Sequence, residues 1–116
     1  MTTPPFSYDS ESHTIRVIAP ELLSDVDIAS YFVDVTSRWG DIRSAHEVVD
    51  FRNVKECTSN AEDFARFQGI WRGLVAGKII TSTTFLVSND YQQHMAEGYV
   101  KALSDAGVDL EIIFKE

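Results

Sequence analysis

Cysteine is almost absent from this chain of 116 residues, in which Cys57 is the only one. A single thiol excludes an intrachain disulfide and a C-x-x-C pair, so a reducing cytoplasm is the predicted compartment. Long hydrophobic runs are absent as well, and residues 1–5 have neither a basic start nor an apolar core. The sequence therefore predicts no cleaved signal and no membrane-spanning helix, with a short N-terminal tail ahead of one domain over residues 6–116.

Positive charge is scarce. Ten Lys and Arg residues stand against 18 Asp and Glu residues, which gives a formal net charge of −8. This excess of negative charge repels phosphate backbones and anionic bilayers, and it removes the counterion release that drives nucleic-acid binding. Nucleic acids and membrane surfaces are therefore not predicted as partners.

Motifs for catalysis and for cofactor binding are also missing. The three histidines, His13, His46 and His94, lie far apart in the sequence and form no H-x-x-x-H pair. Cys57 has no histidine close to it in the sequence to act as its base. Because the glycine-rich phosphate loops and the G-x-S-x-G elbow are absent too, the sequence predicts no metal, no cofactor and no catalytic residues.

Alternating apolar and polar segments are present from the start of the chain. Short β-forming stretches at residues 6–8 and 14–19, separated by the polar set 9–12, predict a β-hairpin. Ser24 and Asp27 then form a capping-box pair before a helical stripe that Gly40 ends. The members of this stripe are Ile28, Phe32, Val35 and Trp39.

A buried strand and a second helix are predicted next. The consecutive apolar residues of the stretch 47–51 indicate a strand that is buried on both faces. Ser59 and Glu62 form a second capping box before a stripe that runs to Gly77. Gly69 and Gly73 lie within this helix, where glycine is unfavourable, so close packing of the helix is expected there.

The last part of the chain predicts strand, helix and strand again. Residues 79–87 form the longest strand candidate, and Asn89 with Asp90 caps a third helix that Gly107 ends. The predicted inner stripe of this helix consists of Tyr91, Met95, Tyr99, Ala102, Leu103 and Ala106. With the alternating final strand around Leu110, Ile112 and Phe114, the predicted order is β-β-α-β-α-β-α-β.

This order, the chain length and the segment Val48–Val54, followed about five residues later by a capped helix, resemble the STAS family. From Phe6 to Lys115 the chain is similar to the small stand-alone bacterial proteins called SpoIIAA-like. The resemblance implies an α/β domain with a mixed sheet whose first two strands are antiparallel and whose other strands are mostly parallel.

The resemblance also points to a candidate regulatory serine. In STAS antagonists a serine at the start of the helix after the strand around Asp50 is phosphorylated and thereby switches partners. Alignment on Asp50 places Ser59 at this position and Thr58 where the family usually has aspartate. The simpler interpretation, which the Glu62 partner favours, is that Ser59 is only the N-cap of its helix.

Four hydroxyl residues interrupt the longest strand candidate at Thr81-Ser82-Thr83-Thr84. An edge position or a half-exposed face explains them most simply, because threonine is a good strand former. The alternative is that Thr81, Thr83 and Thr84 line a polar pocket or a subunit contact.

These observations predict a non-catalytic cytoplasmic module that binds a protein partner or regulates one. The alternative is a domain that binds a small lipid- or nucleotide-type ligand between the threonine-rich strand and the glycine-containing helix. The sequence leaves the partner unidentified and leaves a homodimer open.

Overall fold

The computed structural model describes residues 6–38, 44–58, 69, 72–73, 80–103 and 109–115. Its strands and helices, in chain order, are β1 Phe6–Asp9, β2 Thr14–Ile18, β3 Leu22–Leu23, α1 Asp25–Arg38, β4 Ala45–Asp50, β5 Glu56–Cys57, β6 Ile80–Val87, α3 Asp90–Leu103 and β7 Asp109–Phe114. Gly69, Arg72 and Gly73 are helical as well. The remainder of the predicted second helix, including Ser59, lies outside the described residues.

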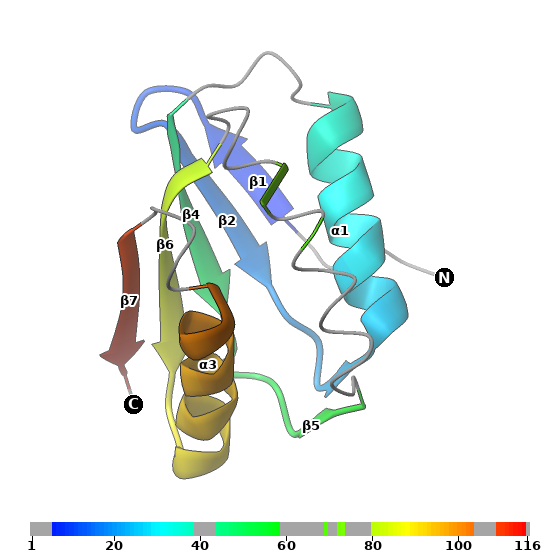
Figure 1. The fold of residues 1–116 in the computed structure, drawn as a ribbon, viewed down its shortest axis with the longest axis vertical. Helices are drawn as coiled ribbons and strands as arrows, with labels where there is room; N and C mark the ends of the chain where they lie inside the picture. The colour runs from blue at the N-terminus through cyan, green and yellow to red at the C-terminus, as the bar shows by residue number, and fades with distance from the viewer. Residues whose placement is uncertain are drawn as a thin grey trace.

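Five strands form one sheet in the order β1-β2-β4-β6-β7 (Figure 1). β1 pairs with β2 in antiparallel fashion, and the other neighbours are parallel. The predicted hairpin and the predicted mixed sheet are therefore confirmed. The sequence did not predict the separate two-stranded parallel sheet of β3 and β5.

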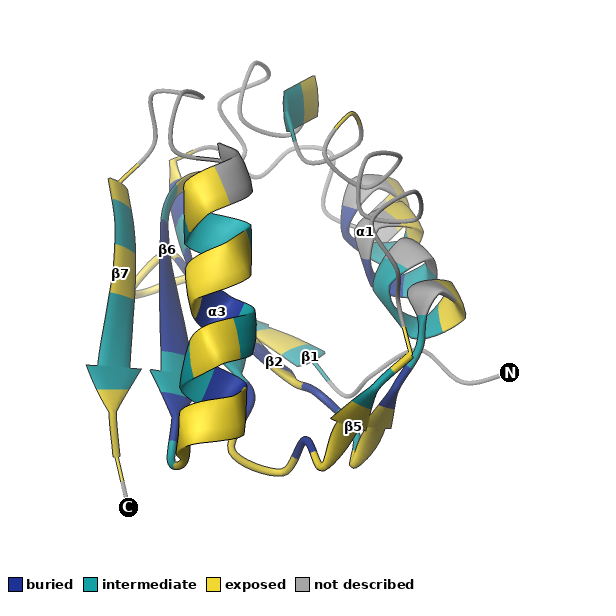
Figure 2. Cartoon of the chain, turned by 60° about the horizontal axis from the view of Figure 1, so that its bottom comes forward, coloured by how far each residue is buried: buried dark blue, intermediate teal, exposed yellow. Residues whose placement is uncertain are grey.

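Helices α1 and α3 lie on the same face of the sheet (Figure 2). Tyr31 of α1 bonds to Glu47 of β4, and the ring of Tyr99 of α3 stacks on Phe85 of β6. Glu47 pairs with Thr83, two residues from Phe85, so both contacts fall on one side of the pleat. Right-handed crossovers between parallel strands produce this arrangement.

The hydrophobic core beneath α3 brings together aromatic rings from the sheet, the helix and the loop after β4. Phe51, Phe85 and Tyr99 stack with centroid separations of 5.5 to 6.0 Å. The buried members of this core cluster are Ala19, Leu23, Phe51, Val54, Phe85, Val87 and Ala96. Burial raises the pKa of Tyr99, whose neutral ring belongs to this stack.

The predicted helix caps agree with the structure where they are described. The backbone N–H of Asp27 donates to the Ser24 hydroxyl, and the Asp27 carboxylate accepts from the Ser24 backbone N–H. The Asn89 side chain likewise accepts from the backbone N–H of Gln92 at 2.9 Å. Both helices thus begin at side chains that satisfy their first free amides.

The predicted inner stripe of the third helix needs a correction. Tyr91 is 48% exposed, whereas Gln92 and Ala96 are buried. Met95 and Tyr99 are partly buried and pack against the core, as expected. The inward face is therefore rotated by one position, because Gln92 bonds to backbone groups that no apolar side chain satisfies.

The expectation for the two helical glycines also fails. A Cβ atom added at Gly69 or at Gly73 would meet nothing within 4 Å. Both residues are exposed. Neither glycine is explained by close packing of its helix.

Candidate functional site

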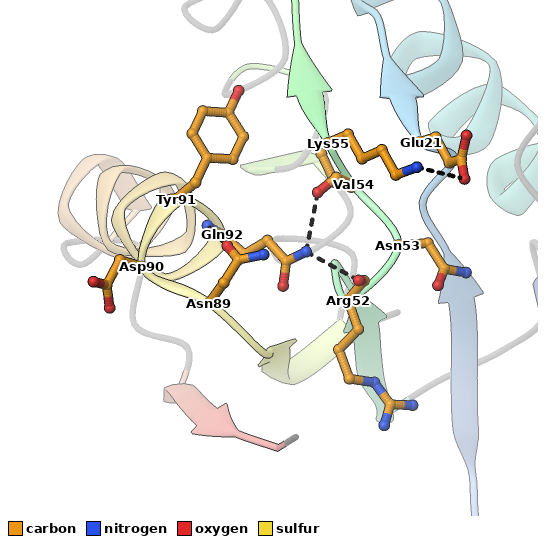
Figure 3. A pocket seen from close by; sticks show the side chains of 9 residues that line it. All are labelled: Glu21, Arg52, Asn53, Val54, Lys55, Asn89, Asp90, Tyr91 and Gln92. Carbon is orange, nitrogen blue, oxygen red and sulfur yellow. Dashed lines mark hydrogen bonds and ion pairs between the residues drawn. The ribbon is translucent and has the colours of Figure 1, made fainter.

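The carboxyl ends of β4 and β6 meet the amino end of α3 at one edge of the sheet. In doubly wound α/β sheets, ligands bind beyond the carboxyl ends of the strands. An open cleft of about 680 Å³ lies here, between the loop that follows β4 and the first turn of α3 (Figure 3). We call it the carboxyl-edge cleft, and it is lined by Glu21, Arg52, Asn53, Val54, Lys55, Asn89, Asp90, Tyr91 and Gln92.

Gln92 fixes the two walls of the cleft to each other. Its Nε2 donates to the backbone oxygens of Arg52 and Val54, at 3.0 Å each. Its Oε1 accepts from both the backbone N–H and the hydroxyl of Ser88. With 1% exposure, this amide is a fully satisfied buried group that fixes the shape of the cleft.

Asp50 and Arg52 form an ion pair at the end of β4. The guanidinium donates from Nε to one carboxylate oxygen at 3.0 Å and from a terminal nitrogen to the other at 2.8 Å. The Arg52 backbone N–H donates to the same carboxylate. These hydrogen bonds lower the pKa of Asp50, although partial burial opposes them. The charge of Arg52 is therefore largely compensated from within the chain.

The second cation of the cleft is compensated too. The Lys55 ammonium lies 3.4 Å from the Glu21 carboxylate, and both side chains are strongly exposed. The backbone N–H groups of Lys55 and Glu56 donate to the Glu21 carbonyl oxygen, which holds this loop in place. Since Asp90 adds a further negative charge, the described lining has no surplus of positive charge for a phosphate group.

Thr58 lies at the same edge, just after β5. Its side chain is exposed. Its backbone N–H and its hydroxyl both donate to the Leu23 carbonyl oxygen, at 2.8 and 3.4 Å. The Tyr91 hydroxyl accepts from the backbone N–H of the neighbouring Cys57 at 2.8 Å and so connects α3 to this segment. Ser59, the aligned candidate phosphosite, lies outside the described residues.

Exposed apolar side chains flank the cleft. Leu22 on β3 is 56% exposed, and Tyr91 on α3 is 48% exposed. Leu22 precedes Leu23, whose backbone pairs with Cys57, and Cys57 in turn bonds to Tyr91. The carboxyl edge therefore combines exposed apolar side chains with paired charges.

A second polar cluster is buried between the sheet and α1. Glu47 is 2% exposed and accepts from the Tyr31 hydroxyl at 2.5 Å and from the Thr83 hydroxyl at 3.0 Å. Burial, and after it the negative charge of Glu47, raises the pKa of Tyr31 well above its ordinary value. This cluster has no opening to solvent through Glu47, Tyr31 or Thr83, because all three are buried.

The threonines of β6 therefore have a different explanation from the one expected. β6 lies between β4 and β7, so the edge-strand interpretation is wrong. The hydroxyls of Thr83 and Thr84 bond to Glu47 and His46 across the β4–β6 pair. Thr83 and Thr84 are buried within the chain, whereas Thr81 is exposed, and a polar pocket or a subunit contact at these residues stays a prediction.

His46 makes two contacts that the sequence did not predict. Its Nδ1 bonds to the Ser82 hydroxyl and its Nε2 to the Thr84 hydroxyl. Their separation in sequence hid this contact, which only parallel pairing of β4 and β6 creates. Both ring nitrogens are occupied by hydroxyl groups, so His46 is placed as a structural hydrogen-bonding group. His13 and His94 are exposed on other elements.

Metal ligands do not converge in the described part of the chain. There, no group of three or more His, Cys, Asp or Glu side chains is arranged to hold a metal ion. No helix among the described residues is both long enough and apolar enough to cross a bilayer.

Comparison with known proteins identifies the fold. The chain matches no model of a known protein family and no curated protein. Among solved structures it is similar to an uncharacterized DUF3478-family protein of Shewanella loihica PV-4, which has a SpoIIAA-like fold. The TM-score is 0.63 at 12% sequence identity, over 98% of this chain and 86% of that one.

The class that the structure defines is therefore a single α/β domain with a mostly parallel sheet and a SpoIIAA-like fold. The resemblance inferred from element order is confirmed at the level of fold. At 12% identity the likeness carries no residue role and no activity to this chain.

Proposed function

We propose that this protein is a non-catalytic cytoplasmic binding module that receives a protein partner on its carboxyl edge. The observation that supports this proposal is the composition of that edge. Exposed Leu22 and Tyr91 flank a cleft whose cations, Arg52 and Lys55, are already paired with carboxylates. Such a surface favours a partner that contributes apolar side chains and polar groups over a small anion.

The regulatory part of the proposal concerns Thr58 and Ser59. Thr58 is exposed at this edge and adjoins the segment that Tyr91 holds. A phosphoryl group on either residue would add about −1.5 to −2 charges next to an edge that contains Glu21 and Asp90. Phosphorylation would therefore repel an acidic partner and strengthen binding of a basic one.

Binding to variants of exposed residues tests the docking surface. Leu22→Glu places a charge on the proposed surface, and Val33→Glu places the same charge on an equally exposed residue of α1. We expect proteins captured from the native cell extract by wild type to be retained by Val33→Glu and lost by Leu22→Glu. If Leu22→Glu and Val33→Glu retain the same proteins, the carboxyl edge is not the binding surface.

Phosphomimetic and alanine variants test the switch separately. Ser59→Asp keeps a helix-capping acceptor and adds charge, whereas Ser59→Ala removes the acceptor at a cost of about 0.5 to 2 kcal/mol. A partner that is released by Ser59→Asp or Thr58→Asp, yet retained by Ser59→Ala and Thr58→Ala, supports regulation by phosphorylation. Equal binding by all four variants would leave Ser59 as a helix cap and nothing more.

The alternative function is binding of a small lipid- or nucleotide-type ligand. The volume of the carboxyl-edge cleft, about 680 Å³, is what favours it, since ligand pockets occupy about 300 to 1,000 Å³. Most such pockets are lined by apolar and aromatic residues, whereas most of the residues that line this cleft are polar or charged. Native mass spectrometry of protein purified from its own cells separates the two proposals, because a retained small molecule would favour the ligand carrier.

A further inference from the structure

The two edges of the five-stranded sheet differ in how they are protected against pairing with other strands. β1 has four residues, of which Ser7 and Asp9 are polar and exposed, and the sequence Pro4-Pro5 precedes it. Short polar edge strands next to proline are poor templates for further pairing. β7, at the other edge, has six residues with the sequence DLEIIF and contains no proline, glycine or lysine.

Among the residues that the structure describes, the outer side of β7 is uncovered. The strand pairs with β6 from Ser82↔Asp109 to Val87↔Phe114 without a register shift, so no bulge bends it away. Among the described residues no strand or helix lies on its outer side (Figure 1). Phe114 at its end is 50% exposed. A regular apolar edge strand of this kind is a template for another strand.

The direction of the backbone groups of β7 follows from one hydrogen bond. The Lys115 N–H donates to the Val87 carbonyl oxygen at 2.7 Å, so residue 115 directs its backbone groups toward β6. Because backbone groups alternate along a strand, Leu110, Ile112 and Phe114 direct theirs outward. The same three residues carry the apolar side chains on the face where the helices lie, since Ile112 pairs with Phe85.

We propose that β7 is a self-association surface, at which two copies of the chain pair their β7 strands in antiparallel fashion about a two-fold axis at Ile112. In this register Ile112 faces the partner's Ile112, and Leu110 faces the partner's Phe114. All three outward-facing residues then exchange backbone hydrogen bonds with the other copy. The two sheets join into one continuous sheet, and the half-exposed Phe114 ring gains an apolar neighbour.

The acidic residues of β7 favour this register over the adjacent register, in which the two-fold axis lies at Glu111. A two-fold axis at Glu111 would place two glutamates directly opposite each other, and like charges in that position are destabilising. With the axis at Ile112, Glu111 faces the partner's Ile113 and Asp109 faces the partner's Lys115. The exposed Lys115 therefore meets an opposite charge, which makes the strand complementary to itself.

This surface is separate from the carboxyl-edge cleft, so it can be tested independently of the proposed function. Sedimentation equilibrium at micromolar concentrations measures self-association directly. Wild type should form a dimer, and Phe114→Lys should weaken the dimer by at least about tenfold, or about 1.4 kcal/mol. The matched control Val33→Lys makes the same charge change at a residue that is 57% exposed on α1, and it should leave the dimer unchanged.

A second variant keeps the test decisive if Phe114→Lys does not fold. Phe114→Pro removes a backbone N–H that faces outward, so the ladder with β6 is preserved while the proposed ladder loses a donor. It should also weaken the dimer. A monomeric wild type at these concentrations would overturn the proposal, as would a dimer that Phe114→Lys and Phe114→Pro both leave intact.

Oxidative cross-linking tests the register. In a Cys57→Ser background, the substitution Ile112→Cys places two thiols opposite each other, with Cα atoms about 5.5 Å apart, which a disulfide can bridge. Glu111→Cys places its two thiols out of register. We expect a covalent dimer from Ile112→Cys and none from Glu111→Cys, and the reverse result would overturn the axis at Ile112.

Discussion

Polar side chains within the central strands β4 and β6 differ in environment from polar side chains beyond the carboxyl ends of the same strands. Along the strands, the buried side chains of Glu47 and Thr83 bond to each other, and buried Thr84 bonds to His46. At the carboxyl edge, Arg52 and Lys55 are exposed around an open cleft. The first region keeps the sheet and α1 together, whereas the second leaves its chemistry available to a partner.

This difference shows that chemical capability alone does not identify a site. His46 lies beside Ser82, and Glu47 lies beside Tyr31, so each pairs a side chain capable of acid–base chemistry with a hydroxyl group. Their hydrogen bonds are satisfied within the chain, so they stabilise the fold. The carboxyl edge is the better candidate because its groups are exposed and held in place by buried Gln92.

The largest expected effect is at Glu47, in the buried polar cluster between the sheet and α1. Glu47→Ala should lower the free energy of unfolding by about 3 kcal/mol, because it opens a cavity and leaves the Tyr31 and Thr83 hydroxyls without an acceptor. Urea denaturation measures this loss. Glu47→Gln keeps the side-chain volume and one acceptor oxygen and should be less damaging, so equal losses from both substitutions would show that the carboxylate, and not the volume, matters at this position.

The next largest effect is expected at Gln92, which connects α3 to the loop after β4. Gln92→Leu keeps the approximate side-chain volume but removes the partners of Arg52 and Val54 carbonyl groups, at a cost of about 2 kcal/mol. Hydrogen exchange should become faster across residues 52–55. The control Gln93→Leu, at a half-buried neighbour in the same helix, should change neither quantity. A Gln92→Leu variant with unchanged stability and unchanged hydrogen exchange would show that the Gln92 amide does not hold the cleft in shape.

Alkaline pH should destabilise the protein through two tyrosines, Tyr31 and Tyr99. Burial raises the pKa values of Tyr31 and Tyr99, so the folded state retains both protons after the unfolded chain has released them. Their contribution to stability is fully present below about pH 10, the ordinary tyrosine value. Above it, stability should fall by about 1.4 kcal/mol per pH unit for each tyrosine. Tyr99→Phe should reduce the slope of the unfolding free energy against pH, and an unchanged slope would contradict this assignment.

The smallest effect is expected at the carboxyl edge, from acid. The pKa of Asp50 is lowered by Arg52, so the pair contributes stability above the ordinary aspartate pKa, about 3.9, and loses it as pH falls through the lower folded value. Because Arg52 is exposed and solvent screens the pair, this contribution should be small. Arg52→Ala should remove it near neutral pH and leave acid-unfolded protein unaffected, as measured by acid titration. A large loss of unfolding free energy in Arg52→Ala would contradict this assignment, because it would mean that the pair stabilises the fold as strongly as a buried contact does.

The sequence predicted the elements of the fold well where local rules decide them. The hairpin, the Ser24 and Asn89 caps and the parallel strands follow from turn residues, capping side chains and crossover geometry. The threonines of β6 were misinterpreted because their partners, His46 and Glu47, lie on β4, more than 30 residues away in sequence. No local pattern signals such a contact.

The candidate site was predicted only in part. Alignment on Asp50 directed attention to Thr58, which does lie at the carboxyl edge. Tyr91 was assigned to the inner face of its helix by periodicity, which places apolar residues inward and therefore passed over Gln92. It cannot anticipate that a glutamine is buried because two carbonyl groups of a distant loop require donors.

By itself, the sequence of this protein determined the order along the chain of the strands that form its five-stranded sheet, the starts of α1 and α3 and its acidic, single-cysteine character, because each depends on residues close together in the chain. Tertiary structure decided which polar groups are buried and which remain exposed. The parallel pairing of β4 with β6 buried Glu47 and His46 among hydroxyls, and the approach of α3 to the loop after β4 formed the cleft. The physical reason is that a buried polar group must find a hydrogen-bond partner, and folding alone brings that partner within reach.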